Sequence, residues 1–154
     1  MPKNKFVIHT DGGSRGNPGP AAIGVIIEPI LQARPVQVLP GKREYGEHIG
    51  VTTNNEAEYQ AVIFALKKLK QLIGNTEAEK AYVVFYIDSE LLVKQFNHEY
   101  KVKESNIQKL FLEVHNLRLD FGKVEFKHVL RDKNADADRL VNQVLDREGN
   151  KLNL

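Results

Sequence analysis

The first third of the chain alternates between short apolar runs and turn-forming residues, a pattern typical of β-strands. The run Lys5–Thr10 ends at Asp11 and is followed by the glycine- and proline-rich stretch Gly12–Pro20. A second strand is expected over Ala21–Glu28, and a third between Gln37 and Val51. Three residues between these two strands favour a long hairpin or irregular loop: Pro35, Pro40 and Gly41.

The apolar positions then change to a helical period, which predicts a helix over Thr53–Ile73. Gly74-Asn75 is a typical helix end. The apolar residues of this helix stand at positions 61, 62, 65, 66, 69, 72 and 73.

The next segment predicts a buried strand and two helices. Ala81–Ile87 is almost wholly apolar, as expected of a central strand covered on both faces. A short helix follows over Ser89–Asn97, and Ser105 is the expected N-cap of the next helix. That helix has one apolar stripe, made of Ile107, Leu110, Phe111, Val114 and Leu117.

The last segment predicts an edge strand and a helix. Gly122–Val129 alternates between polar and apolar residues, and Asn134 is the expected N-cap of a helix that runs to about Asp146. The complete order is β-β-β-α-β-α-α-β-α. We therefore expect an α/β fold in which a five-stranded mixed sheet is flanked by helices, built as one domain over residues 1–154.

Composition narrows the class of protein. The chain has 154 residues, 42% of them apolar and 27% charged, which is typical of a globular domain. It has no cysteine, so a disulfide scaffold, a cysteine zinc site and a thiol nucleophile are excluded. No apolar run is long enough to span a membrane, and no signal-peptide core follows the first residues, so we expect a cytoplasmic protein. A formal charge of +2 indicates little about partners.

Two aspartates directly follow apolar strands. Asp11 follows the first strand and Asp88 the fourth. If these strands are parallel neighbours, their carboxylates converge at the sheet edge where α/β proteins bind ligands. Alternatively, each aspartate begins a turn or caps a helix, a role that suits Asp88-Ser89 well.

In the helix predicted over Thr53–Ile73, the helix face on which each acid lies distinguishes a functional acid from a structural one. Thr53 and Glu56 match a capping box, in which the Glu56 carboxylate bonds back to the Thr53 amide. Glu58 instead shares the apolar stripe of Val62 and Leu69, and an unpaired carboxylate on a buried face costs several kcal/mol, on the order of its desolvation. Glu58 is therefore the candidate for chemistry.

The last helix repeats this arrangement. Asp136 lies in the first turn and complements the helix dipole, whereas Asp138 shares a face with Val141 and Leu145. Four carboxylates at one sheet edge, with no cysteine or histidine cluster beside them, predict an all-oxygen site for Mg²⁺ or Mn²⁺. Such a site is typical of two-metal phosphoryl transfer.

The glycine-rich loop does not match a phosphate-binding or dinucleotide motif. It is either a tight hairpin entry or a segment in which Gly12 and Gly13 let a sugar-phosphate backbone approach the metal site. The five histidines are scattered, and His9 on the first strand fits a core residue.

With these motifs in place, the sequence resembles ribonuclease H of type 1 over nearly its whole length. Four segments carry the resemblance: Thr10–Pro20 (TDGGSRGNPGP), Thr53–Glu58 (TNNEAE), Ile87–Ser89 (IDS) and Asn134–Asn142 (NADADRLVN). The family pattern places its catalytic glutamate at Glu58 and its last aspartate at Asp138, in agreement with the helix faces.

The resemblance implies hydrolysis of the RNA strand of RNA–DNA hybrids, leaving 5′-phosphate and 3′-hydroxyl ends. It implies that Asp11 bridges two Mg²⁺ ions, that Glu58 and Asp88 help to hold the ion nearer the leaving group, and that Asp138 holds the ion that activates water. Mn²⁺ is the expected substitute, and we expect a monomer with no membrane partner. The implied substrate contacts are Gly12, Gly13, Asn17, Asn54, Asn55 and Ser89, with the asparagines reading the 2′-hydroxyl.

The sequence departs from many relatives in three ways. The loop before the last helix is short and has no histidine, so Arg131 or Lys133 is left to substitute for it electrostatically. No basic, tryptophan-containing protrusion is present, only Lys94, Lys101 and Lys103. We also expect no appended hybrid-binding domain, and therefore low processivity. The short loop is similar to the form found in archaea and some bacteria, which implies activity on double-stranded RNA as well.

Two other classes of protein share this fold. The alternative reading is a catalytically weak module that binds hybrid or duplex RNA, and such modules usually lose a metal carboxylate. An exonuclease or integrase relative would carry other motifs around its acids. Two bound Mg²⁺ ions would cancel four acidic charges and raise the formal charge from +2 to +6, so grip on the substrate should depend on metal more than on the number of lysines.

Overall fold

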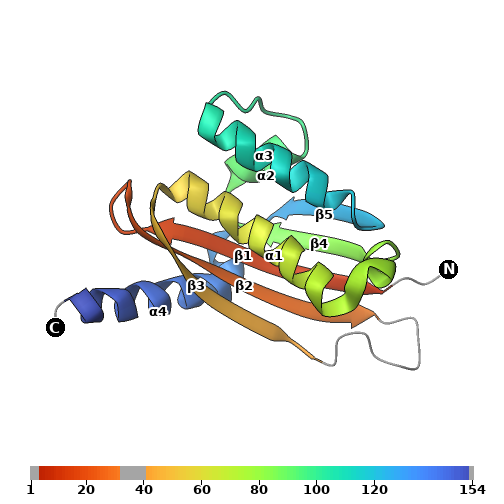
Figure 1. The fold of residues 1–154 in the computed structure, drawn as a ribbon, viewed down its shortest axis with the longest axis horizontal. Helices are drawn as coiled ribbons and strands as arrows, with labels where there is room; N and C mark the ends of the chain where they lie inside the picture. The colour runs from red at the N-terminus through yellow and green to blue at the C-terminus, as the bar shows by residue number, and fades with distance from the viewer. Residues whose placement is uncertain (1–3, 32–40, 153–154) are drawn as a thin grey trace.

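The computed structural model describes residues 4–31 and 41–152, which form one twisted five-stranded sheet with helices on both faces (Figure 1). The strands are β1 (Lys5–Ser14), β2 (Gly19–Leu31), β3 (Arg43–Thr52), β4 (Tyr82–Ile87) and β5 (Lys123–His128). The helices are α1 (Asn54–Ala78), α2 (Glu90–Phe96), α3 (Ser105–Arg118) and α4 (Ala135–Leu152), with a short 3₁₀ helix, η1 (Arg131–Asn134), before α4. Within these residues, no helix has the length and apolar character needed to cross a membrane.

The sheet has the strand order β3-β2-β1-β4-β5. β1 pairs with β2, and β2 with β3, in antiparallel fashion, so the first three strands form a meander. β4 is parallel to both β1 and β5. The predicted mixed sheet and the predicted order of elements are therefore confirmed, including the place of β5 at an edge.

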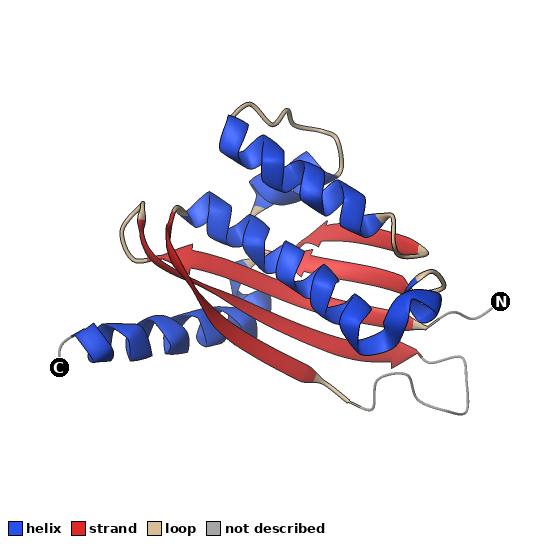
Figure 2. Ribbon diagram, viewed as in Figure 1, coloured by secondary structure: helices blue, strands red, loops and turns tan. Residues whose placement is uncertain are grey.

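The helices form two layers (Figure 2). α1 packs on one face of the sheet and α3 packs against α1, whereas α4 crosses the other face over β2 and β3. The larger core lies under α1 and contains residues such as Phe6, Ile8 and Leu66, all fully buried. A smaller cluster under α4 consists of Ala22, Val141, Val144 and Leu145. The sheet edge between these layers is where the predicted carboxylates meet.

The end of β1 and the start of α3 differ from the sequence predictions. β1 continues to Ser14, because its antiparallel pairing with β2 extends past Thr10, where its pairing with β4 ends. Asp11 therefore lies inside a strand. Ser105 is the first residue of α3, not its N-cap, and Glu104 in the cap position makes no side-chain cap bond.

The third strand begins at Arg43, and Pro35 and Pro40 of the predicted loop lie outside the described residues. The predicted helix end is confirmed, since Gly74 has a φ of 83° that interrupts α1 before one further turn.

Candidate active site

Two neighbouring parallel strands bring Asp11 and Asp88 together. Thr10 of β1 pairs with Ile87 of β4, so the next residue on each strand leaves the parallel ladder at the same sheet edge. Asp11 is 8% exposed, although it is an ionisable residue. The convergence that was predicted from two strand ends is thus confirmed as geometry.

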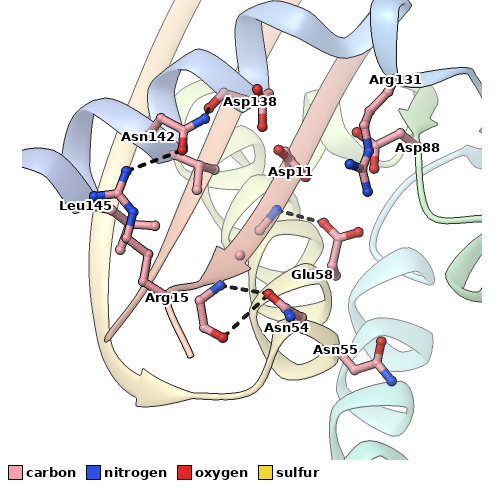
Figure 3. Close-up of a pocket in the computed structure, with 14 residues that line it drawn as sticks. Asp11, Arg15, Asn54, Asn55, Glu58, Asp88, Arg131, Asp138, Asn142 and Leu145 are labelled. Atoms are coloured by element: carbon pink, nitrogen blue, oxygen red, sulfur yellow. Dashed lines mark hydrogen bonds between the residues drawn. The ribbon is translucent and has the colours of Figure 1, made fainter. Parts of the chain in front are cut away.

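The first turn of α1 adds Glu58 to this edge. Thr53 caps the helix by accepting a hydrogen bond from the Glu56 amide at 3.2 Å. One turn further, the Glu58 carboxylate accepts a hydrogen bond from the Gly12 amide at 2.7 Å. This bond ties the helix to β1 and aims the Glu58 carboxylate at Asp11 (Figure 3).

Gly12 has a packing reason for being glycine. A Cβ atom at this position would lie 2.3 Å from the Ala57 carbonyl oxygen, so a side chain would push α1 away from β1. A Cβ atom at Gly13 would meet the nearest atom, of Val141, at 3.7 Å, an ordinary contact. Gly12 therefore allows the close approach of α1 to β1. Its predicted role, to let a substrate backbone approach, stays a prediction.

Glu56 points away from the carboxylates. Its carboxylate accepts hydrogen bonds from the Thr52 hydroxyl and from Asn106 Nδ2, the latter at 2.7 Å. The predicted bond to the Thr53 amide is not the one formed, because these two side-chain donors take its place. Glu56 nevertheless has the structural role that was expected of it, since it links α1 to β3 and α3.

α4 supplies the fourth carboxylate. Asp138 lines the same cavity as Asp11, on the helix face that also carries Val141 and Leu145. It is exposed and stands at the rim, outside the group formed by Asp11, Glu58 and Asp88. Asp136 lines a different cavity beside His9, so the predicted division between the two aspartates of α4 holds.

Asn134 is the residue whose role the sequence misassigned. Its side chain does not cap α4. Instead, Nδ2 donates hydrogen bonds to the Thr10 carbonyl at 2.8 Å and to the Asp88 carboxylate at 3.1 Å. The residue is 1% exposed, and its Oδ1 has no hydrogen-bond partner among the described residues. Asn134 therefore holds Asp88 against the end of β1.

The four carboxylates line one open cavity of about 370 Å³ (Figure 3). Of the predicted substrate contacts, Gly12, Gly13, Asn54 and Asn55 lie in its wall. The cavity also contains Val141 and Leu145, which were predicted to share the face of Asp138, and three residues that the sequence did not single out: Ser14, Arg15 and Asn142. Asn142 follows Asp138 at a helical spacing of four residues, which is the signal that could have revealed it.

Two predicted contacts lie outside this wall. Asn17 Oδ1 accepts a hydrogen bond from the Asn54 amide at 2.9 Å, so it fastens the glycine-rich loop to the start of α1. Ser89 caps α2 by accepting from the Leu92 amide at 3.3 Å. The structure gives both residues a positioning role, and their contact with substrate stays a prediction.

The proximity of the acids changes their protonation. Burial raises the pKa of Asp11 to about 7, and the Asp88 carboxylate adds to the rise. Burial also raises the pKa of Glu58 well above its ordinary value, with further contributions from Asp11 and Asp88. Each group therefore resists ionisation unless positive charge is placed among them.

This donor set fits divalent metal. One carboxylate oxygen from each of Asp11, Glu58 and Asp88 lies within 4.8 Å of the others, and Asp138 offers a further carboxylate from the rim. All the ligands are oxygens, which suits Mg²⁺ or Mn²⁺. A cation here would also cancel the repulsion that raises the pKa values of Asp11 and Glu58.

The metal-free protein is expected to lose stability as pH rises. A carboxyl group whose pKa is higher in the folded state binds more protons when folded, so the free energy of unfolding falls between the unfolded and folded pKa values. For Asp11 this interval runs from 3.8 to about 7. The expected loss is roughly 4 kcal/mol for this group.

Urea unfolding in EDTA at about pH 5 and about pH 7 measures roughly 2 kcal/mol of this loss, the part that falls between these two pH values, with Asp11→Asn as the control that removes it. Mg²⁺ should restore stability at the higher pH by binding the folded state. Equal stability at both pH values in EDTA, or no response to Mg²⁺, would contradict the assignment.

The comparisons with known proteins agree with this architecture. The family described as Reverse transcriptase-like matches residues 9–144. The bifunctional protein Rv2228c of Mycobacterium tuberculosis is 39% identical over 142 residues, which are 92% of this chain and 36% of that protein. Ribonuclease HI of Halobacterium salinarum is 34% identical over 136 residues, 88% of this chain and 62% of that protein. The chain thus spans less than two thirds of the length of either relative.

Solved structures are similar over almost the whole chain. The N-terminal RNase H domain of Rv2228c has a TM-score of 0.82 at 32% identity, covering 97% of this chain and 99% of that one. LC11-RNase H1, solved in complex with an RNA/DNA hybrid, has a TM-score of 0.79 at 39% identity, covering 93% and 98%. These matches show that the chain belongs to the ribonuclease H family, type 1.

Proposed function

We propose that this chain is a metal-dependent endonuclease that hydrolyses the RNA strand of RNA–DNA hybrids and leaves 5′-phosphate and 3′-hydroxyl ends. The observation that carries the proposal is the convergence of Asp11, Glu58, Asp88 and Asp138 on one open cavity. Family membership supports it, as does the LC11-RNase H1 structure with its bound hybrid. We extend the proposal to double-stranded RNA as a weaker substrate and to a monomeric, cytoplasmic protein.

The carboxylates of Asp11, Glu58, Asp88 and Asp138 would hold two Mg²⁺ ions. When bound, such ions lower the pKa of an attacking water and stabilise charge on the departing 3′-oxygen. The chain itself fixes the ligands: the Gly12 amide orients Glu58, and Asn134 orients Asp88. Asp138 is exposed, so its carboxylate is accessible to a metal ion that enters together with the substrate.

Strand choice requires a group that recognises the 2′-hydroxyl of RNA. Asn54 Oδ1 accepts a hydrogen bond from the Ser14 amide at 2.8 Å, which fixes the side chain at the cavity wall. Its Nδ2 has no hydrogen bond among the described residues and is therefore available to donate to a sugar hydroxyl. Asn54 is thus the best-placed reader of the RNA strand.

A second groove, of about 180 Å³, adjoins this cavity at Asn55. Lys101 and Lys103 line it together with Asn55, which belongs to both walls and points away from the carboxylates in Figure 3. Ammonium groups in such a groove suit the phosphates of a second strand. A duplex, with one strand at the carboxylates and the other along this groove, fits both features.

Four labelled duplexes test the proposal: an RNA–DNA hybrid, double-stranded RNA, double-stranded DNA and an RNA–DNA junction, each with Mg²⁺ or Mn²⁺. We expect cleavage of the RNA strand of the hybrid, slower cleavage of double-stranded RNA and none of DNA. An intact hybrid that nevertheless binds the protein would establish the alternative, a binding module without catalysis. Cleavage of double-stranded DNA would contradict strand selectivity.

Arg131 is the expected replacement for the histidine that this loop lacks. Its side chain lines the carboxylate cavity together with Asp88 and Glu58 (Figure 3), whereas Lys133 lines the separate cavity around His9. Arg131→Ala should therefore lower kcat on the hybrid by about tenfold, because a positive charge near the reacting phosphate is lost. Lys133→Ala is the matched control and should stay within about twofold. Steady-state kinetics measure both, and a larger effect of Lys133→Ala would reverse the assignment.

A further inference from the structure

Arg15 stands at the entrance of the carboxylate cavity. It follows β1 in the loop that leads to β2, and its side chain is 47% exposed. The guanidinium lies 2.6 Å from the Asp146 carboxylate and donates a weak hydrogen bond to Asn142 Oδ1 at 3.5 Å. Asn142 in turn donates to the Asp138 carbonyl at 3.1 Å. Arg15 is thus held over the face of α4 that carries Asp138.

We propose that Arg15 binds a backbone phosphate of the strand that lies in the carboxylate cavity, next to the phosphate that is cleaved. In binding, its guanidinium exchanges Asp146 for the phosphate, while Asn142 keeps it oriented. The inference rests on the proposed function, because it assumes a nucleic-acid strand in this cavity.

The position of the charges supports this role. Arg15 and Arg131 are the two cationic residues in the described wall of the cavity, and they lie on opposite sides of Asp11 and Glu58 (Figure 3). A strand whose reacting phosphate meets the carboxylates carries further phosphates on either side. One neighbouring phosphate lies toward Arg131 and the other toward Arg15. The two arginines therefore define the line along which the strand crosses the cavity.

The pairing of Arg15 with Asp146 is suited to exchange. Both side chains are on the surface, with exposed fractions of 47% and 64%, and exposed ion pairs contribute little to stability. A phosphate offers a guanidinium two parallel hydrogen bonds, which gives it the advantage over a single carboxylate oxygen. Asp146 therefore keeps Arg15 in place before the substrate arrives, without holding it strongly.

Arg139 provides a matched control. It has nearly the same exposure as Arg15, 46%, and it also pairs with carboxylates, those of Glu44 and Asp136. It lies on α4 but outside the wall of the cavity. Removing its charge changes the net charge of the protein as much as removing that of Arg15.

The test measures binding of a labelled RNA–DNA hybrid by fluorescence anisotropy across a series of salt concentrations, in an Asp88→Asn background that suppresses cleavage. Arg15→Ala should weaken binding by about tenfold at low salt and reduce the slope of log affinity against log salt by about one, the value for one lost phosphate contact. Arg139→Ala should leave the slope unchanged. Asp146→Asn should bind at least as tightly as the parent protein.

Hybrids with a single uncharged methylphosphonate in the RNA strand locate the contact. One position should weaken binding by the parent protein and have no effect on Arg15→Ala. The inference would be overturned if Arg15→Ala had the same salt slope and affinity as Arg139→Ala. It would also be overturned if no methylphosphonate position weakened binding by the parent protein while leaving Arg15→Ala unaffected. If the wild-type protein binds the hybrid with a salt slope that depends on Arg15 but does not cleave it, only the proposed hydrolysis is contradicted. Failure to bind hybrid at all would overturn both.

Discussion

Glu58→Gln is expected to abolish cleavage of the RNA–DNA hybrid, with a fall in kcat of at least about a thousandfold. The substitution keeps the shape of the side chain and can keep the hydrogen bond from the Gly12 amide. It removes the negative charge that metal requires. The fold should therefore survive, and the metal-free variant should be no less stable than the wild type, because burial of this carboxylate is unfavourable.

Glu56→Gln is the matched control, on the same helix and two residues away. It should retain activity within about threefold and lose roughly 1 kcal/mol of stability, because its bonds to Thr52 and Asn106 become weaker. Single-turnover cleavage and urea unfolding of both variants measure these effects. Loss of activity in Glu56→Gln with an active Glu58→Gln would mean that the wrong acid is assigned to metal.

Asp138→Asn should lower kcat by about a hundredfold or more, because the proposed metal site would lose one charged ligand. Asp138 is exposed at the rim, so no folding defect should accompany the loss. Its carboxylate contributes to the raised pKa of Asp11, after burial and Asp88, which places it within electrostatic reach of the buried acids. The activity of the variant should depend on a higher concentration of Mg²⁺ than that of the wild type.

Asp136→Asn is the matched control, because Asp136 lies on the same turn of α4 but outside the wall of the carboxylate cavity. Asp136 lines the cavity around His9 and forms an ion pair with Arg139 at 3.9 Å. Its kcat should stay within about twofold of the wild type, since exposed pairs contribute little. Comparable losses in Asp136→Asn and Asp138→Asn would contradict the assignment of Asp138 as the metal ligand.

Periodicity was sufficient to predict the parts of the site that lie on helix faces. Glu58 shares a stripe with Val62 and Leu69, both fully buried, and Asp138 shares one with Val141 and Leu145. The helical period thus separates each of these acids from its neighbour two residues before, Glu56 or Asp136. The end of β4 at Ile87 was predicted as well, because a nearly continuous apolar run indicates a buried parallel strand, whereas β1 continues past Thr10 to Ser14.

Long-range hydrogen bonds were beyond the reach of the sequence. Asn134 precedes a helix and has the residue type of a cap, yet its amide donates to Thr10, 124 positions away, and to Asp88. Only the fold brings those acceptors within reach. Similarly, nothing local indicates that Gly12 is needed because the Ala57 carbonyl approaches it, or that Arg15 pairs with Asp146 of α4.

The most direct test of the central claim, that these four acids form a metal-dependent centre for cleaving RNA, uses the wild-type protein and one hybrid with separate labels on its two strands. We predict that Mg²⁺ converts the RNA strand to fragments with 5′-phosphate and 3′-hydroxyl ends, that the DNA strand stays whole, and that EDTA stops the reaction. An RNA strand that stays intact at every concentration of Mg²⁺ and Mn²⁺, or one that is cut equally well in EDTA, would contradict it.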